Sequence, residues 1–280
     1  SKANQLSPTD VQKILQIFAR HNIGNRELIK PCKSIVRKNI GNISPEDIPA
    51  LFVSLVDLNR LDDNLRKVFL PVVHEEMMTM DPSDVLDCAF AMCVIKSYPG
   101  KTWKRILSRL GKGVEMFSDP TKAFKLFKIV QSLRKETDLH SFPGFDGLYN
   151  RICEANDFKY FAKDVQAEGL PFAALRTVLD EQLGLSYKDS VFINGHYCHF
   201  QILPDTIVVL SGRSEFYAGT RGHRGASLLK LRQIRNYGFK VLEIPYFEWE
   251  PLATAQDKAD YVSEKLLRIG SAAYKNLAIQ

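Results

Sequence analysis

Apolar positions in the first half of the chain repeat with a spacing of 37 residues. Two series share this spacing: Leu15, Phe52 and Ala89 in a first helix, and Cys32, Phe69 and Ile106 in a second. The apolar residues around them follow helical spacing, which predicts two helices per unit, of about 12 and about 14 residues. Such helical pairs are stable when neighbouring units stack and bury their apolar faces. The pattern therefore predicts a helical-pair solenoid.

Polar residues mark the start of each unit. The pairs Ser7–Pro8, Ser44–Pro45 and Asp81–Pro82 open the first three units, and a fourth begins at Ser118 with one inserted residue. Serine and aspartate cap helices, and proline suits the first helical position because its missing N–H would have no intrahelical partner there. We predict a side-chain cap at the first three of these starts, from Ser7, Ser44 and Asp81.

The pattern changes in the second half, where strands alternate with a helix. Residues 207–210 form a short β-branched run, a loop follows at 211–225, and residues 226–236 have helical spacing. Gly238 ends that helix, and residues 239–245 form a second apolar run that stops at Pro245. A strand–loop–helix–strand unit of this kind makes its two strands parallel.

The remaining elements complete a small α/β domain. Asn194–Gly195 predicts a hairpin between strands at 191–193 and 197–201, and residues 254–278 predict one or two helices that cover the sheet. We expect three parts in the chain: helical-pair repeats at 1–155, a linker with a helix at 156–187, and the α/β domain at 188–280.

Positive charge is concentrated in the second half. The whole chain has a net charge of +6. Between positions 213 and 240 the single acidic residue is Glu215, and the basic residues are Arg213, Arg221, Arg224, Lys230, Arg232, Arg235 and Lys240. A localised basic segment is typical of phosphate binding, and we add His223 as a phosphate contact. The alternative is a solvated loop and helix face.

A second basic cluster lies in the repeats, at Lys101, Lys104, Arg105 and Arg109. Solenoids offer extended surfaces for RNA, so these residues are candidate RNA contacts, with a solvated helix face as the alternative. Aromatic residues are interleaved with the charges between positions 216 and 249. Most belong to the core, and one or two are candidates for stacking on unpaired bases.

Composition excludes several classes of protein. The chain has 45% hydrophobic and 25% charged residues, as a globular protein does, and it has no run of 18 apolar residues that would predict a membrane span. Its five cysteines form no CxxC pair, and their odd number argues against a disulfide framework and favours a reducing compartment. A zinc site is not expected, because His196, Cys198 and His199 are too close together without a second ligand pair. We expect no cofactor and no metal.

The strongest motif is Ile-Pro-Tyr-Phe-Glu-Trp at 244–249, preceded by the glycine-led strand 238–241. Together with the strand 207–210, Gly212 and residues 229–232, it resembles a RAP domain, an endonuclease-like module of organellar RNA proteins. The repeats are similar to heptatricopeptide or octotricopeptide arrays and to the helical region that precedes RAP in the Fas-activated kinase-like family. The resemblance implies RNA binding in the mitochondrion. The kinase name implies no kinase activity, since GxGxxG, HRD and DFG are all missing from the sequence.

One position departs from the RAP pattern. RAP domains usually have Val-Asp-Gly-Pro after the first strand of the crossover, whereas this chain has Leu-Ser-Gly-Arg at 210–213. Ser211 thus replaces the carboxylate that metal-dependent phosphodiester cleavage requires. We interpret the site as degenerate and the protein as a non-catalytic RNA-binding component of a ribonucleoprotein, with ribosomal RNA and neighbouring subunits as partners. The alternatives are an RNA processing or stability factor, a metal-dependent nuclease using Glu215, Glu243 and Lys230, and a protein scaffold.

Overall fold

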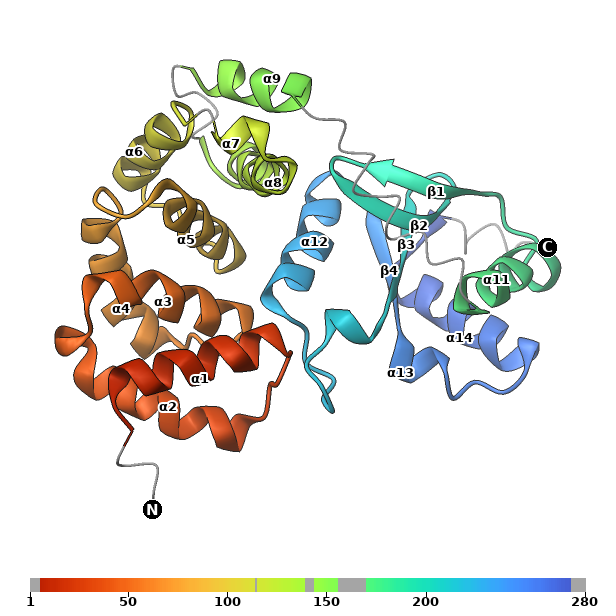
Figure 1. Ribbon diagram of the computed structural model, residues 1–280. Helices are drawn as coiled ribbons and strands as arrows, with labels where there is room; N and C mark the ends of the chain where they lie inside the picture. Colours follow the sequence, from red (N-terminus) through yellow and green to blue (C-terminus); the bar gives the residue numbers. More distant parts are fainter. Residues whose placement is uncertain (1–5, 114, 139–143, 156–169, 273–280) are drawn as a thin grey trace. The chain divides into compact units, whose positions relative to one another are not determined.

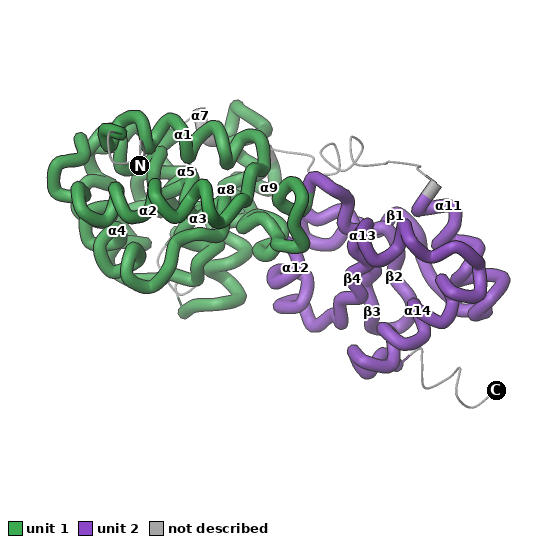
Figure 2. The backbone as a smooth tube through the Cα atoms, turned by 90° about the horizontal axis from the view of Figure 1, so that it is seen from below, with its two compact units in different colours: residues 1–156, 215–229 green, residues 157–214, 230–280 purple. Residues whose placement is uncertain are grey.

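The computed structural model describes residues 6–113, 115–138, 144–155 and 170–272, which form two compact units (Figures 1 and 2). Unit 1 consists of residues 1–156 together with 215–229, and unit 2 of residues 157–214 together with 230–280. The chain therefore leaves the second unit after its third strand, packs residues 215–229 with the helical repeats, and then returns. The predicted linker falls largely on 156–169, which lie outside the described residues.

Unit 1 is an array of helical pairs, as the repeats predict. Its helices are α1 (Pro8–Arg20), α2 (Arg26–Asn39), α3 (Ile48–Asp57), α4 (Asp63–Glu76), α5 (Pro82–Val94), α6 (Gly100–Leu110), α7 (Glu115–Ser118), α8 (Pro120–Glu136) and α9 (Phe145–Ala155). The first helices stack in one row, α1 on α3, α3 on α5 and α5 on α8. Helices α2, α4 and α6 form a second row (Figure 1). The predicted combination of a helical solenoid and an α/β domain is confirmed.

The core of unit 1 follows the 37-residue series. Each predicted core position is at most 3% exposed: Leu15, Phe52, Ala89, Cys32, Phe69 and Ile106. Burial of a side chain such as Leu or Phe contributes about 1.5–3 kcal/mol each, so these layers stabilise the stack. The solenoid prediction is therefore confirmed at the level of individual side chains.

The predicted caps differ from one repeat to the next. Ser7 forms a full capping box, in which its hydroxyl accepts from the Asp10 N–H and the Asp10 carboxylate accepts from the Ser7 N–H. Ser44 precedes a 3-10 turn at Pro45–Asp47, and its backbone carbonyl, not its side chain, accepts from the Asp47 N–H. Asp81 lies at the N-cap of α5 without a side-chain hydrogen bond. The prediction of side-chain caps was wrong for these two starts.

Unit 2 contains one four-stranded sheet in the order β1-β2-β3-β4. Strands β1 (Tyr187–Ile193), β2 (His196–Ile202) and β3 (Thr206–Ser211) are antiparallel, and β4 (Lys240–Pro245) pairs parallel with β3. The Asn194–Gly195 hairpin is confirmed, with both residues at positive φ. Strand β1 begins four residues before its predicted start. The prediction missed these residues because Lys188–Ser190 are exposed and lack an apolar alternation.

Helices cover both faces of this sheet (Figure 1). On one face α11 (Leu170–Thr177) and α14 (Ala255–Arg268) pack on Phe200, Val208 and Leu242. On the other face α12 (Gly225–Asn236) contributes Leu231 and Ile234. The short helix α13 (Tyr246–Trp249) follows β4 directly. No helix among the described residues is both long and apolar enough to span a bilayer.

Candidate nucleic-acid interface

The basic segment of the sequence forms the crossover between β3 and β4. Val209 lies opposite Glu243 in the parallel register, and α12 runs between the two strands and ends before Gly238, at a φ of 89°. This arrangement confirms the predicted strand–loop–helix–strand unit. The loop is more ordered than a solvated loop would be, because it contains a 3-10 turn at Arg213–Glu215 and a β-bridge between Phe216 and His223.

Residues 215–229 are anchored on the first two helical repeats. The Tyr217 hydroxyl donates to the Asp57 carbonyl at 2.7 Å, and the Ala218 N–H donates to the Asn22 carbonyl at 2.7 Å. The Tyr217 side chain is buried, and this burial, with the nearby Asp57 carboxylate, raises the pKa of its hydroxyl above the ordinary value. Tyr217 is thus an anchor of the loop rather than a base-stacking platform.

Two glycines allow this close approach. A Cβ at Gly24 would lie 2.4 Å from the Tyr217 side chain, and a Cβ at Gly225 would lie 2.7 Å from the Val56 carbonyl oxygen. Both distances are shorter than a carbon can tolerate without displacement of its neighbour. The first residue of α12 therefore packs directly against the end of α3.

Three of the predicted phosphate-binding cations are engaged in ion pairs. Arg224 lies 2.9 Å from the Asp57 carboxylate, Arg213 2.6 Å from Glu250, and Lys240 2.7 Å from Asp205. Arg213 also lies over the ring of Tyr246, 4.6 Å from its centroid. Arg224 and Lys240 therefore have structural partners, whereas Arg213 retains a side chain that is 72% exposed.

The other predicted residues of the segment divide by exposure. Arg221 and Arg235 are exposed, and Lys230, Arg232 and His223 are half-buried. The His223 ring packs on Phe216, with 4.3 Å between the ring centroids. The segment itself divides between the units, with Arg221, His223 and Arg224 in unit 1 and the remaining cations in unit 2.

Lys230 lies near a buried histidine of the sheet. Burial lowers the pKa of His199 to about 4, and the positive charge of Lys230 contributes in the same direction. The His199 Nδ1 accepts a hydrogen bond from the Leu210 N–H at 3.1 Å. A neutral imidazole is required for that bond, so His199 is a structural group in this fold.

The second predicted cluster lies on α6. Lys101, Lys104 and Arg105 are exposed. Arg109 is different, because its guanidinium donates to the Met77 carbonyl at 2.6 Å and also to the Met80 carbonyl. It therefore holds the turn between α4 and α5, while the other three form the exposed part of the cluster.

Helix α8 carries cations that the sequence analysis did not select. Lys122, Lys125 and Lys128 follow one another at i, i+3 spacing, and Arg134 and Lys135 lie in its last turn. This spacing was the available signal, since residues three apart share one helix face. The signal is weak because these cations alternate with the apolar core residues of the same helix.

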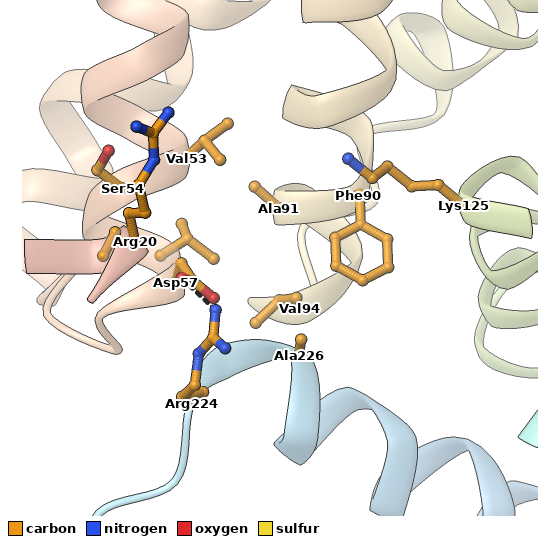
Figure 3. A pocket seen from close by; sticks show the side chains of 12 residues that line it. Arg20, Val53, Ser54, Asp57, Phe90, Ala91, Val94, Lys125, Arg224 and Ala226 are labelled. Atoms are coloured by element: carbon orange, nitrogen blue, oxygen red, sulfur yellow. Dashed lines mark hydrogen bonds and ion pairs between the residues drawn. The ribbon is translucent and has the colours of Figure 1, made fainter. Parts of the chain in front are cut away.

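Lys125 borders a pocket of about 260 Å³ in unit 1. Figure 3 shows side chains of α1 and α3 on one side of this pocket and side chains of α5 on the other, with Arg224 and Ala226 at one end. Its wall includes the half-buried ring of Phe90 and the buried residues Val56 and Ala91. No local pattern of residues indicates this pocket, because its residues come from five distant segments.

The carboxyl edge of β3 and β4 corresponds to the nuclease position of the RAP resemblance. The Ser211 hydroxyl donates to Glu243 Oε1 at 2.6 Å. Nearby, Glu248 accepts from the Tyr261 hydroxyl at 2.6 Å and pairs with Lys265 at 2.6 Å. Among the residues that the structure describes, no group of three or more His, Cys, Asp or Glu side chains is arranged to hold a metal ion. Glu215 of the nuclease hypothesis belongs to unit 1 and bonds to Ser227 there.

The second half is a small α/β domain with a hairpin, a parallel crossover and helices that cover each face of its sheet. The RAP domain family matches residues 191–265, so this segment of the chain is similar to a RAP domain. Over nearly its whole length it is similar to the mouse (Mus musculus) FAST kinase domain-containing protein 1, mitochondrial. The two are 20% identical over 323 aligned positions, which cover 96% of this chain and 38% of that relative. Both findings confirm the resemblance to RAP-domain proteins of the Fas-activated kinase-like family.

Proposed function

We propose that this chain is a non-catalytic RNA-binding protein of the mitochondrion and that it binds ribosomal RNA as a component of the mitochondrial ribosome. The RAP domain at residues 191–265 carries the proposal of RNA binding. The printed name of the mouse relative supports the compartment. The chain spans 38% of that relative, so any activity of the longer protein is a separate matter.

Exposed cations supply the phosphate contacts. The proposed contacts in the RAP segment are Arg213, Arg221 and Arg235, with His223, Lys230 and Arg232 at the half-buried margin. Lys101, Lys104 and Arg105 of α6 form a further contact surface. Phosphate contacts position RNA without reading its bases, so affinity should fall steeply with salt.

Crosslinking of the native protein to RNA in its own cells, followed by sequencing of the attached RNA, tests this function. Dominant crosslinks to one ribosomal RNA are the expected result. Scattered messenger or precursor transcripts would replace the ribosomal role with RNA processing or stability control. An absence of RNA above background would overturn RNA binding altogether.

Salt dependence tests the α6 contacts with purified protein. Replacement of Lys101, Lys104 and Arg105 by alanine should reduce the slope of log affinity against log salt by about 2, at about 0.7 per lost phosphate contact on single-stranded RNA. Arg268→Ala is the matched control, because Arg268 is exposed but paired with Glu264 within α14. Equal slopes for the triple variant and the control would show that these α6 residues do not contact RNA phosphates.

A protein scaffold is the second candidate function, and one observation favours it. Ile17 of α1 and Leu28 of α2 are 52% and 51% exposed, respectively, so both present apolar surface that a partner protein could cover. Retention of partner proteins by a variant that has lost RNA binding would support the scaffold.

A further inference from the structure

The pocket between α3 and α5 combines three chemical features that are rarely found together on a helical surface. It has an apolar wall, an aromatic ring and cationic side chains at its edge. A mostly apolar pocket with a few polar groups is the usual form of a small-ligand site. A ligand that suits this lining has a flat apolar body with polar edges and carries negative charge beside it.

The apolar wall consists of buried side chains. Val56 and Ala91 are 3% and 2% exposed, and Val94 also lines the pocket, from α5. The half-buried Phe90 ring lines the pocket too, and Figure 3 shows it on the side where Lys125 lies. A half-buried aromatic ring that lines a pocket is a platform on which a nucleobase can stack.

Cations reach the pocket from separate elements. Lys125 of α8 lies with its Nζ 5.9 Å from the Phe90 ring centroid and 2.5 Å from the Asp87 carboxylate. Arg20 of α1 is exposed at the opposite side, and no ion pair with Arg20 forms within the described ranges of the chain. The first amides of α12, at Ala226, add the positive end of a helix dipole. These groups suit the phosphates on either side of a base.

Polar groups inside the pocket are few and well placed. The Ser54 side chain is 5% exposed, and Ser54 and Asp57 both line the wall opposite Phe90. One oxygen of the Asp57 carboxylate pairs with Arg224, which fixes the orientation of the group. A hydroxyl and a fixed carboxylate are hydrogen-bonding partners for the polar edge of a base.

We propose that this pocket receives one unpaired nucleotide of the bound RNA, with its base against Phe90 and its flanking phosphates on Arg20 and Lys125. This inference rests on the proposed RNA-binding function and extends it, because it assigns base contact to the helical repeats. Residues 224–226 complete the pocket, so the RAP segment contributes to a site whose wall belongs to the repeats.

Fluorescence anisotropy with a labelled single-stranded RNA of about 12 nucleotides tests the proposal. Phe90→Ala should weaken RNA binding at least about fivefold, the lower end expected for loss of one base stack. Phe124→Ala is the matched control, because Phe124 is a half-buried phenylalanine on α8 that does not line the pocket. The control should change affinity less than about twofold.

Inorganic polyphosphate, which has phosphates but no bases, separates stacking from charge. It should compete for the native protein and for Phe90→Ala equally well. Phe90→Leu keeps an apolar wall without an aromatic face, and it should lose RNA affinity while its thermal midpoint stays close to that of the native protein. This second variant distinguishes loss of stacking from loss of the fold.

Three results would overturn the inference. The first is equal RNA affinity for Phe90→Ala and Phe124→Ala, and the second is full RNA affinity for Phe90→Leu. The third is a loss of polyphosphate binding in Phe90→Ala as large as its loss of RNA binding. Each leaves RNA binding by the native protein intact, so it would reject the nucleotide site in the pocket without rejecting the proposed function. Failure of the native protein to bind RNA at all would instead reject the proposed function.

Discussion

The residues matched by the RAP family fall into two parts that are held in place in different ways. The sheet part, which contains Ser211 and Glu243, satisfies its polar groups with neighbours from the same part. The loop part, residues 215–229, depends on partners about 160 positions earlier in the chain, as in the bond from Tyr217 to Asp57. One family motif therefore includes a self-contained core and a segment that needs the repeats for its conformation.

The difference teaches how charge in a sequence should be interpreted. Arg224 and Arg221 are three positions apart and equally basic, yet Arg224 is half-buried beside Asp57 and Arg221 is exposed. A basic segment is thus a mixture of half-buried cations with a structural role and exposed cations. Variants that separate the two parts sharpen this comparison.

The largest expected effect concerns His199 in the sheet part. Its pKa is about 4 in the folded protein, against an ordinary value of 6.5. Between these values the unfolded chain takes up a proton that the folded sheet does not. The contribution of neutral His199 to the free energy of unfolding is therefore complete above pH 6.5. As the pH falls to 4, the free energy of unfolding decreases by about 3 kcal/mol. Urea unfolding followed by Trp249 fluorescence in a Trp103→Phe background measures it.

His199→Asn keeps a hydrogen-bond acceptor but cannot be protonated in this range. Its free energy of unfolding should fall less between pH 6.5 and 4 than that of the native protein. His21→Asn replaces an exposed histidine and should retain the native pH dependence. Superimposable curves for His199→Asn and the native protein would show that this histidine is accessible to protons in the folded sheet.

The next effect compares two glycines of the same crossover, one in each part. Gly225→Ala places a Cβ 2.7 Å from the Val56 carbonyl oxygen, and such overpacking costs about 1–3 kcal/mol. Gly212→Ala meets no atom within 4 Å and should change the free energy of unfolding by less than about 0.5 kcal/mol. Urea unfolding followed by Trp103 fluorescence in a Trp249→Phe background measures Gly225→Ala, and Trp249 fluorescence in a Trp103→Phe background measures Gly212→Ala. Equal changes in the free energy of unfolding would contradict the close packing of α12 on α3.

A smaller effect separates the two arginines of the loop. Arg224→Ala leaves the Asp57 carboxylate without its partner, and because both side chains are less than 30% exposed, the cost should be about 1 kcal/mol. Arg221→Ala removes an exposed side chain, so it should cost less stability than Arg224→Ala and should reduce the salt slope of RNA binding by about 0.7. Thermal unfolding should rank Arg224→Ala as the more damaging variant and RNA titration should rank Arg221→Ala so; the same ranking in both measurements would contradict the distinction between half-buried and exposed cations.

The smallest effect is expected at the carboxyl edge of the sheet. The native protein should leave labelled RNA intact in the presence of Mg²⁺ or Mn²⁺, and Glu243→Gln should behave in the same way, because one-metal and two-metal cleavage need clustered carboxylates. Gel analysis over several hours measures this. Divalent-dependent cleavage by the native protein that Glu243→Gln abolishes would establish a nuclease.

Much of the fold followed from local patterns. The 37-residue series located the buried layers that include Leu15 and Phe52, and the glycine at 238 with the run before Pro245 located β4. These predictions succeeded because helix periodicity and strand termination depend on neighbours in sequence. The side-chain caps at Ser44 and Asp81 failed because a backbone hydrogen bond of a 3-10 turn serves at the first, and at the second no side-chain bond forms.

The candidate site was less predictable than the fold. The charge pattern pointed to Arg221 and Arg235, which are exposed, but it gave no means to recognise Arg109 or Arg224 as structural cations. Their carbonyl and carboxylate partners are 29 to 167 positions away. The pocket beside Phe90 was invisible for the same reason, since it forms where separate helices meet a segment from the second half.

The bond between Tyr217 and Asp57 has a consequence for the order in which the protein assembles. Contacts within and between neighbouring repeats are local, and local contacts form early, whereas closure over 160 positions is slow. During synthesis the repeats leave the ribosome first. The surface beside Gly24 and Val56 therefore exists for a time without its cover, and the pocket is completed only when residues 215–229 arrive. A nascent chain stopped before position 215 would present folded repeats with an open docking surface, which a chaperone or an early RNA could occupy.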